Sequence, residues 1–210
     1  MEFPNFNQKI FKTLNNDKIT IEEMKAIEPI IIENCKTSVK LMYNYYFLTI
    51  VLITIWFLIE SSIISKVTIF NVDIDNKKFI LFFLPFVSIA TYYISVSYMG
   101  FNQLSDAGLK QIQAKLYPNI HEPSILDIMI YPSIIELETI KVRLSKDSLI
   151  SSLWFLIVSF TFLSFPLLMN GVICWKLMFN DCSMIFFPVV YTLIMIKIIF
   201  DIVFYIKQVQ

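Results

Sequence analysis

Long runs of uncharged, mostly apolar residues recur along the chain and alternate with shorter charged segments. Three uncharged runs cover Leu41–Ile59, Phe79–Ser105 and Leu149–Trp175, and a fourth apolar run, Ser183–Ile206, is interrupted by Lys197 and Asp201. A helix needs about 20 apolar residues to cross the roughly 30 Å hydrocarbon layer of a bilayer. The pattern therefore predicts an all-α fold, namely a polytopic membrane protein with four transmembrane helices and cytoplasmic helical extensions.

The same pattern divides the chain into four parts. We expect an N-terminal cytoplasmic helical segment over 1–40, a first transmembrane helix pair over 41–105, a cytoplasmic helical connection over 106–148 and a second transmembrane helix pair over 149–206. The second apolar run has 27 residues, which as a helix measure about 40 Å and exceed the bilayer. Its helix should therefore project into water until Pro118 ends it.

Local signals predict where several elements begin and end. Thr20 followed by Glu23 has the spacing of a capping box, so a helix should start near Ile21, and Pro29 should bend it. Lys176–Cys182 is short and polar enough to be a tight connection between the last two spans. The connection between the first two spans should form a brief hairpin, because apolar residues alternate at Val67, Ile69, Val72 and Ile74.

Composition supports bilayer over water as the solvent of the apolar runs. Hydrophobic residues make up 57% of the chain and charged residues only 16%, whereas about 25% charged residues is typical of soluble domains. Seventeen Lys and Arg balance seventeen Asp and Glu, which excludes a global basic field for nucleic acid. Near the ends of the spans, nine cations lie on the side of the termini and four on the other. This asymmetry predicts an inner-membrane protein with both termini in the cytoplasm.

Residue types that carry common chemistry are scarce. Three glycines and one histidine, His121, provide neither a phosphate-binding loop nor a usual zinc site. We therefore expect no enzyme, catalytic residue, metal or cofactor. Cys174 and Cys182 flank the last connection, and they are either bridged on an oxidising side or are small buried hydrophobes.

Three charged residues interrupt the spans: Glu60, Lys197 and Asp201. An unpaired charge in a bilayer costs about 2.5–3.5 kcal/mol or more, so each needs a reason to be there. Lys197 and Asp201 are four residues apart and could pair on one helical face or reach the headgroups. Glu60 is either an interfacial carboxylate held by Ser61 or Ser62, or one member of a carboxylate ring at the mouth of an oligomeric cation pathway.

Small polar residues form stripes on the second and third spans. Such stripes either join helices by hydrogen bonds or line a wetted pore between several copies of the chain. The candidates are Ser88, Thr91, Ser95, Asn102, Ser152, Ser159 and Asn170.

Basic residues of the connection between the second and third spans are candidate contacts for anionic lipid, a nucleotide or an oligonucleotide. A solvated helical surface is the alternative, because acidic residues are interspersed. The candidates are Lys110, Lys115, Lys141, Arg143 and Lys146.

In its general layout, with four spans, cytoplasmic helical extensions and no enzyme motif, the chain resembles the small membrane effectors of bacterial anti-phage defence systems. That resemblance implies ion leakage through an oligomeric channel, with opening controlled by a cytoplasmic partner enzyme or its nucleotide product. The leading hypothesis is accordingly a non-enzymatic homo-oligomeric channel gated by a cytoplasmic ligand or partner.

Two other functions stay open from the sequence. The chain could be a membrane anchor or scaffold that recruits a soluble partner, with the polar groups serving only packing. It could also be a small proton-coupled exporter that uses Glu60 as a proton carrier, although the scarcity of glycine argues against the broken helices that many transporters use.

Overall fold

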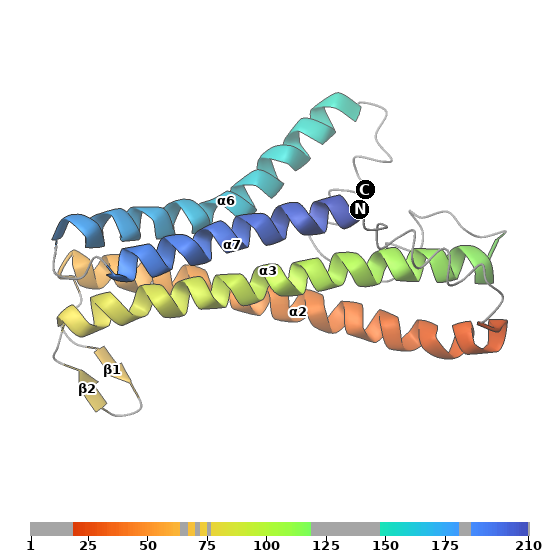
Figure 1. The fold of residues 1–210 in the computed structure, drawn as a ribbon, viewed down its shortest axis with the longest axis horizontal. Coiled ribbons are helices and arrows are strands. Elements are labelled where there is room, and N and C mark those ends of the chain that lie inside the picture. The colour runs from red at the N-terminus through yellow and green to blue at the C-terminus, as the bar shows by residue number, and fades with distance from the viewer. Residues whose placement is uncertain are drawn as a thin grey trace. The chain divides into compact units, whose positions relative to one another are not determined.

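The computed structural model describes residues 19–63, 67–69, 72–74, 77–118, 148–180 and 186–209. In this part of the chain the structure is all-helical apart from one short hairpin (Figure 1). The elements are α2 (Ile21–Glu60), β1 (Val67–Ile69), β2 (Val72–Ile74), α3 (Lys77–Leu116), α6 (Ser148–Asn180) and α7 (Phe186–Val209).

Helix α2 begins and ends with hydrogen-bonded caps. The Thr20 N–H donates to Oε2 of Glu23 at 2.8 Å, and the Glu23 N–H donates to Oγ1 of Thr20 at 3.2 Å. This confirms the capping box and the helix start at Ile21. At the other end Ser62 has a φ of 61°, and the Ile63 N–H donates to the Leu58 carbonyl at 3.1 Å. The chain thus leaves α2 through a left-handed residue, as in a Schellman motif.

The hairpin between α2 and α3 is also confirmed. Strands β1 and β2 pair antiparallel, with Val67 opposite Ile74 and Ile69 opposite Val72. Helix α3 is 40 residues long in total. It continues beyond the apolar segment and ends at Leu116, two residues before Pro118. The expected extension of this helix into polar sequence is therefore present.

The last connection is shorter than predicted. Helix α6 continues through Asn180, so most of Lys176–Cys182 is helical and the expected turn there is wrong. The physical reason is that Lys176–Asn180 contains neither glycine nor proline, so nothing stops the helix where the charge first appears. Cys182 lies outside the described residues.

The chain divides into two compact units. The first unit comprises Met1–Leu41, Ser97–Thr161 and Asp201–Gln210, and the second Met42–Val96 and Phe162–Phe200.

In the first unit the start of α2 packs antiparallel against the end of α3. Cys35 and Leu109 form one buried cluster, and Met24 and Ile112 form another. A carboxylate joins the same two helices: Glu28 accepts hydrogen bonds from the Gln113 side chain at 3.2 Å and from the Tyr117 hydroxyl at 3.1 Å. The hydrogen bond to Glu28 and the charge of its carboxylate raise the pKa of Tyr117.

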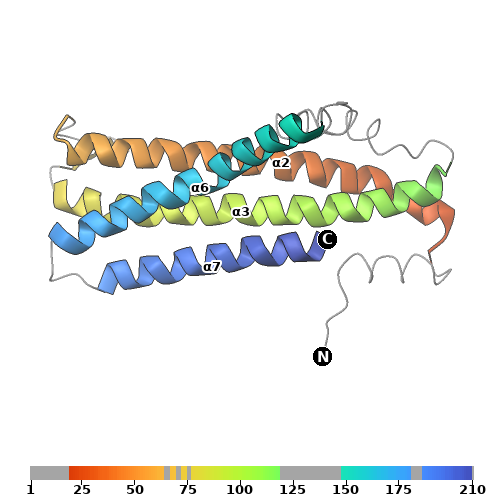
Figure 2. The same ribbon diagram turned by 90° about the horizontal axis from the view of Figure 1, so that it is seen from above.

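In the second unit, segments of all four helices lie alongside one another (Figures 1 and 2). The core combines α2, α3 and α6 through Ile53, Trp56, Ile59, Ile80, Leu84 and Ile173. Two helical segments of the described chain, Ile21–Glu60 and Phe79–Leu116, are long and apolar enough to cross a membrane. Leu163–Leu177 is a shorter apolar stretch of α6.

The capping box makes the start of α2 sensitive to pH. The hydrogen bonds from Thr20 lower the pKa of Glu23 below its ordinary value of 4.5. The bonds therefore stabilise the folded helix start at neutral pH, and this stabilisation is lost as the pH falls through the lowered pKa. A ¹³C NMR titration of the Glu23 carboxyl should give a midpoint below 4.5. Thr20→Ala should raise it and Thr20→Ser should not, whereas a wild-type midpoint at or above 4.5 would contradict the assignment.

Candidate functional site

The polar stripe of α3 lies in contacts between helices of the second unit. Ser88 is 1% exposed and donates to Oδ1 of Asn170, which is 0% exposed, at 3.2 Å. The hydroxyls of Thr91 and Thr49 are 2.9 Å apart, and Ser95 donates to the Met42 carbonyl at 2.9 Å. These buried groups connect α3 to α6 and α2 within one chain.

The remaining stripe residues fall elsewhere. Asn102 belongs to the first unit, where its Oδ1 accepts a hydrogen bond from the buried Ser38 hydroxyl at 3.4 Å. Ser152 and Ser159 lie on α6, but their side chains are outside the described part of the structure. Ser38 and Thr49, the partners on α2, were not recognised as site residues from the sequence. Their signal is a spacing of eleven residues, about three helical turns, which places both hydroxyls on one face.

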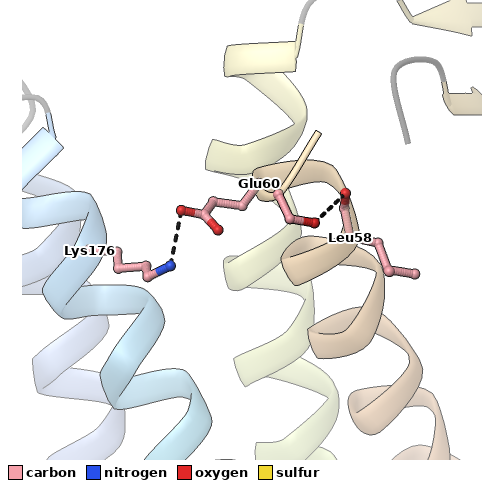
Figure 3. A network of polar contacts seen from close by, with 4 residues as sticks. Leu58, Glu60 and Lys176 are labelled. Carbon is pink, nitrogen blue, oxygen red and sulfur yellow. Dashed lines mark hydrogen bonds and ion pairs between the residues drawn. The ribbon is translucent and has the colours of Figure 1, made fainter. Parts of the chain in front are cut away.

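Glu60 forms an ion pair between α2 and α6. Its Oε1 accepts from Nζ of Lys176 at 3.0 Å, and the two side chains are 29% and 38% exposed. Figure 3 shows Lys176 reaching from α6 toward Glu60 at the end of α2. The Lys176 ammonium also lies 5.7 Å from the ring centroid of Phe57. The Ser61 hydroxyl donates to the Leu58 carbonyl at 3.1 Å instead. The partner that the structure shows for Glu60 is Lys176, which the sequence pattern did not predict.

Lys197 contacts an aromatic ring of α3. Its Nζ lies 5.8 Å from the ring centroid of Tyr93, within the range of a cation–π interaction. Asp201 follows one turn later on α7, is half-buried, and belongs to the first unit.

The basic candidates of the 106–148 connection are only partly described. Nζ of Lys110 lies 2.6 Å from Oδ2 of Asp106, so its charge is neutralised within α3. Lys115 is exposed near the end of that helix. Lys141, Arg143 and Lys146 lie outside the described residues, as does His121.

Two prolines are buried inside helices, and a neighbouring helix satisfies the carbonyl that one of them opens. Pro85 lies inside α3 and has no N–H for the carbonyl of Leu81, four residues earlier. Nε1 of Trp56 donates to this carbonyl at 2.8 Å. Near Pro166, which lies inside α6, the Tyr92 hydroxyl donates to the Leu163 carbonyl, three residues before the proline, at 2.6 Å.

The described residues include no cluster of His, Cys, Asp or Glu that could hold a metal ion. Cys174 is a buried thiol whose Sγ lies 4.0 Å from Oγ1 of Thr192. Comparison of the chain with known protein families, curated proteins and solved structures finds no match. The candidate site is therefore defined by its geometry alone: a set of buried polar contacts and one ion pair that join apolar helices.

The contribution of the hydrogen bond between Trp56 and the Leu81 carbonyl to stability should depend on Pro85. Trp56→Phe should lower the free energy of unfolding by about 1 kcal/mol beyond its packing loss, because the Leu81 carbonyl is left unsatisfied. In a Pro85→Ala background the new N–H can bond that carbonyl, so Trp56→Phe should lose only the packing part. Equilibrium unfolding of the four proteins in detergent measures this coupling, and an equal effect of Trp56→Phe in both backgrounds would disprove it.

The Glu60–Lys176 pair should tolerate exchange of its charges. Glu60→Gln and Lys176→Gln should each destabilise the protein by about 0.5–1 kcal/mol, a modest value because both side chains are about one third exposed and screened by solvent. Glu60→Lys combined with Lys176→Glu should recover part of this loss, but not the interaction with Phe57. Thermal unfolding of the variants at low and high salt tests the pair. The pair would be ruled out if the double reversal lost as much stability as Glu60→Lys and Lys176→Glu lose in sum when each is made alone.

Proposed function

We propose that the chain is an integral inner-membrane protein with four spans, within 41–105 and 149–206, and with both termini in the cytoplasm. Support comes from the outward side chains of the second unit, which are large and apolar on every helix. Examples are Phe47, Phe83, Leu168, Leu193 and Phe200, which are 70%, 56%, 63%, 61% and 69% exposed. Water disfavours so much exposed hydrocarbon, whereas lipid tails match it.

Within that membrane placement, the function we propose is that of a non-enzymatic anchor that recruits a soluble protein to the cytoplasmic face. One observation carries this proposal. Among the described residues of the polar stripes, side chains that a water-filled path would need are bonded to other helices of the same chain, as Ser88 is to Asn170 and Thr91 is to Thr49. These contacts serve to hold the helices together, and they supply no polar face to a pore.

The recruiting surface that we propose is the outer side of α2 in the first unit. Ile27 and Ile30 are exposed there at 39% and 60%, and Glu23 and Glu33 are exposed on the same side of the helix. Apolar side chains flanked by carboxylates fit a protein that presents apolar and basic side chains. A nucleotide fits less well, because its phosphates carry the same sign of charge as these carboxylates.

A photo-crosslinking amino acid placed at Ile30 tests this surface in living cells. It should give a discrete protein adduct, and Ile27→Lys should abolish the adduct without changing membrane insertion. The matched control is the same crosslinker at Phe47, which is also exposed on α2 but should face lipid and give no protein adduct. Absence of an adduct at position 30, or equal adducts at both positions, would contradict the anchor.

The second candidate is a homo-oligomeric channel gated by a cytoplasmic ligand or partner, the activity that the resemblance to defence effectors implies. One observation favours it. Nδ2 of Asn170 and the hydroxyl of Tyr191 are buried with no hydrogen-bond partner among the described residues. Each such group costs about 1–3 kcal/mol, and water entering between the helices would remove that cost. Dye release from liposomes that contain the purified protein, with ion selectivity altered by Lys197→Leu, would favour this candidate over the anchor.

A further inference from the structure

Two lysines of α2 stand directly before its apolar run. Lys36 and Lys40 are four residues apart and thus share one face of the helix. The apolar run begins at Leu41, so at 1.5 Å per residue both lysines lie within about 8 Å of its start along the helix axis. The headgroup layer on each side of a bilayer is about 5–7 Å thick. If α2 crosses the membrane as proposed above, Lys40 lies within the headgroup layer and Lys36 lies at its outer edge.

The packing of the first unit directs these two side chains outward. Cys35 is next to Lys36 in the sequence, and Ser38 lies between the two lysines. Both are buried, with exposed fractions of 0% and 2%. Cys35 packs against Leu109 of α3, whereas Lys36 and Lys40 are exposed. In the described part of the chain neither lysine forms an ion pair. No carboxylate of the described residues therefore neutralises these two charges.

The charges of α3 at the same level do not offset these lysines. Ser38 bonds Asn102, which shows which part of α3 lies beside this part of α2. The charged residues that follow there, Asp106 and Lys110, pair with each other at 2.6 Å and add no net charge. The nearest exposed carboxylate on α2 is Glu33, about 12 Å from Leu41 along the helix and thus beyond the headgroup layer.

We propose that Lys36 and Lys40 form a binding surface for the headgroup phosphate of anionic phospholipids in the cytoplasmic leaflet. The inference rests on the four-span placement proposed above. A lysine has a long apolar stem and a compact charged end, so it can lie along the edge of the hydrocarbon and present its ammonium to phosphate. Anionic leaflets attract each such lysine by about fivefold in affinity. Two lysines on one face would thus distinguish phosphatidylglycerol from phosphatidylcholine.

Native mass spectrometry of the detergent-solubilised protein tests the surface, because it resolves the dissociation constants of single lipid-binding events. Wild-type protein should bind phosphatidylglycerol more tightly than phosphatidylcholine. Lys36→Gln combined with Lys40→Gln should weaken the first phosphatidylglycerol event by on the order of 25-fold and leave phosphatidylcholine unchanged. Replacement of both lysines by arginine should retain the preference, since the charges remain.

Lys25→Gln is the matched control. Lys25 is also exposed on α2 and forms no ion pair in the described structure, but it lies about 24 Å from Leu41 along the helix and should have no effect. The proposal is overturned if wild type shows no preference, if the double glutamine variant keeps it, if Lys25→Gln removes it equally, or if soluble glycerol phosphate binds as tightly as the lipid. Alkaline extraction of proteoliposomes separates the two ideas: protein released by carbonate refutes the membrane placement itself, whereas retained protein without lipid preference refutes only the lysine surface.

Discussion

The structure depends on one constraint: polar groups in apolar helices must find partners on neighbouring helices. Water satisfies stray carbonyls and hydroxyls of a soluble bundle, but little water is available between apolar helices. Several polar groups of the second unit meet the constraint with direct contacts, including Thr49 with Thr91, Ser88 with Asn170, and Trp56 with the carbonyl opened by Pro85. Each contact joins two different helices. The same bonds that remove the cost of burial therefore also determine which helix faces meet.

The same constraint explains the ion pair at the end of α2, because a charged group among apolar helices also needs a partner. A carboxylate near the end of an apolar helix suggests a functional group when it is considered alone. Beside Lys176, 3.0 Å away, Glu60 is one half of a neutral pair that attaches α6 to α2.

The sequence predicted the local features well because their causes are local. Thr20 and Glu23 bond across three residues, the hairpin follows from alternation in eight residues, and Pro118 stops α3 by its own chemistry. The contacts between helices could not be predicted in the same way. Periodicity shows which residues share a face, but it does not show which two faces meet or at what height. The polar residues from Lys176 onward predict a tight connection, whereas α6 continues past Lys176 and brings it to Glu60, so this pairing does not follow from the sequence.

The bond from Trp56 to Leu81 also has a consequence for how the chain is made. The indole is on α2 and the open carbonyl is on α3, so during synthesis each group lacks its partner until the second helix has emerged. The ribosome synthesises α2 first, when the Trp56 indole N–H has no acceptor. It synthesises α3 afterwards, and there Pro85 leaves the Leu81 carbonyl without a donor in its own helix. Joining removes both penalties together. Under the membrane placement proposed above, this favours release of the two helices into the bilayer as a preassembled hairpin over their release one by one.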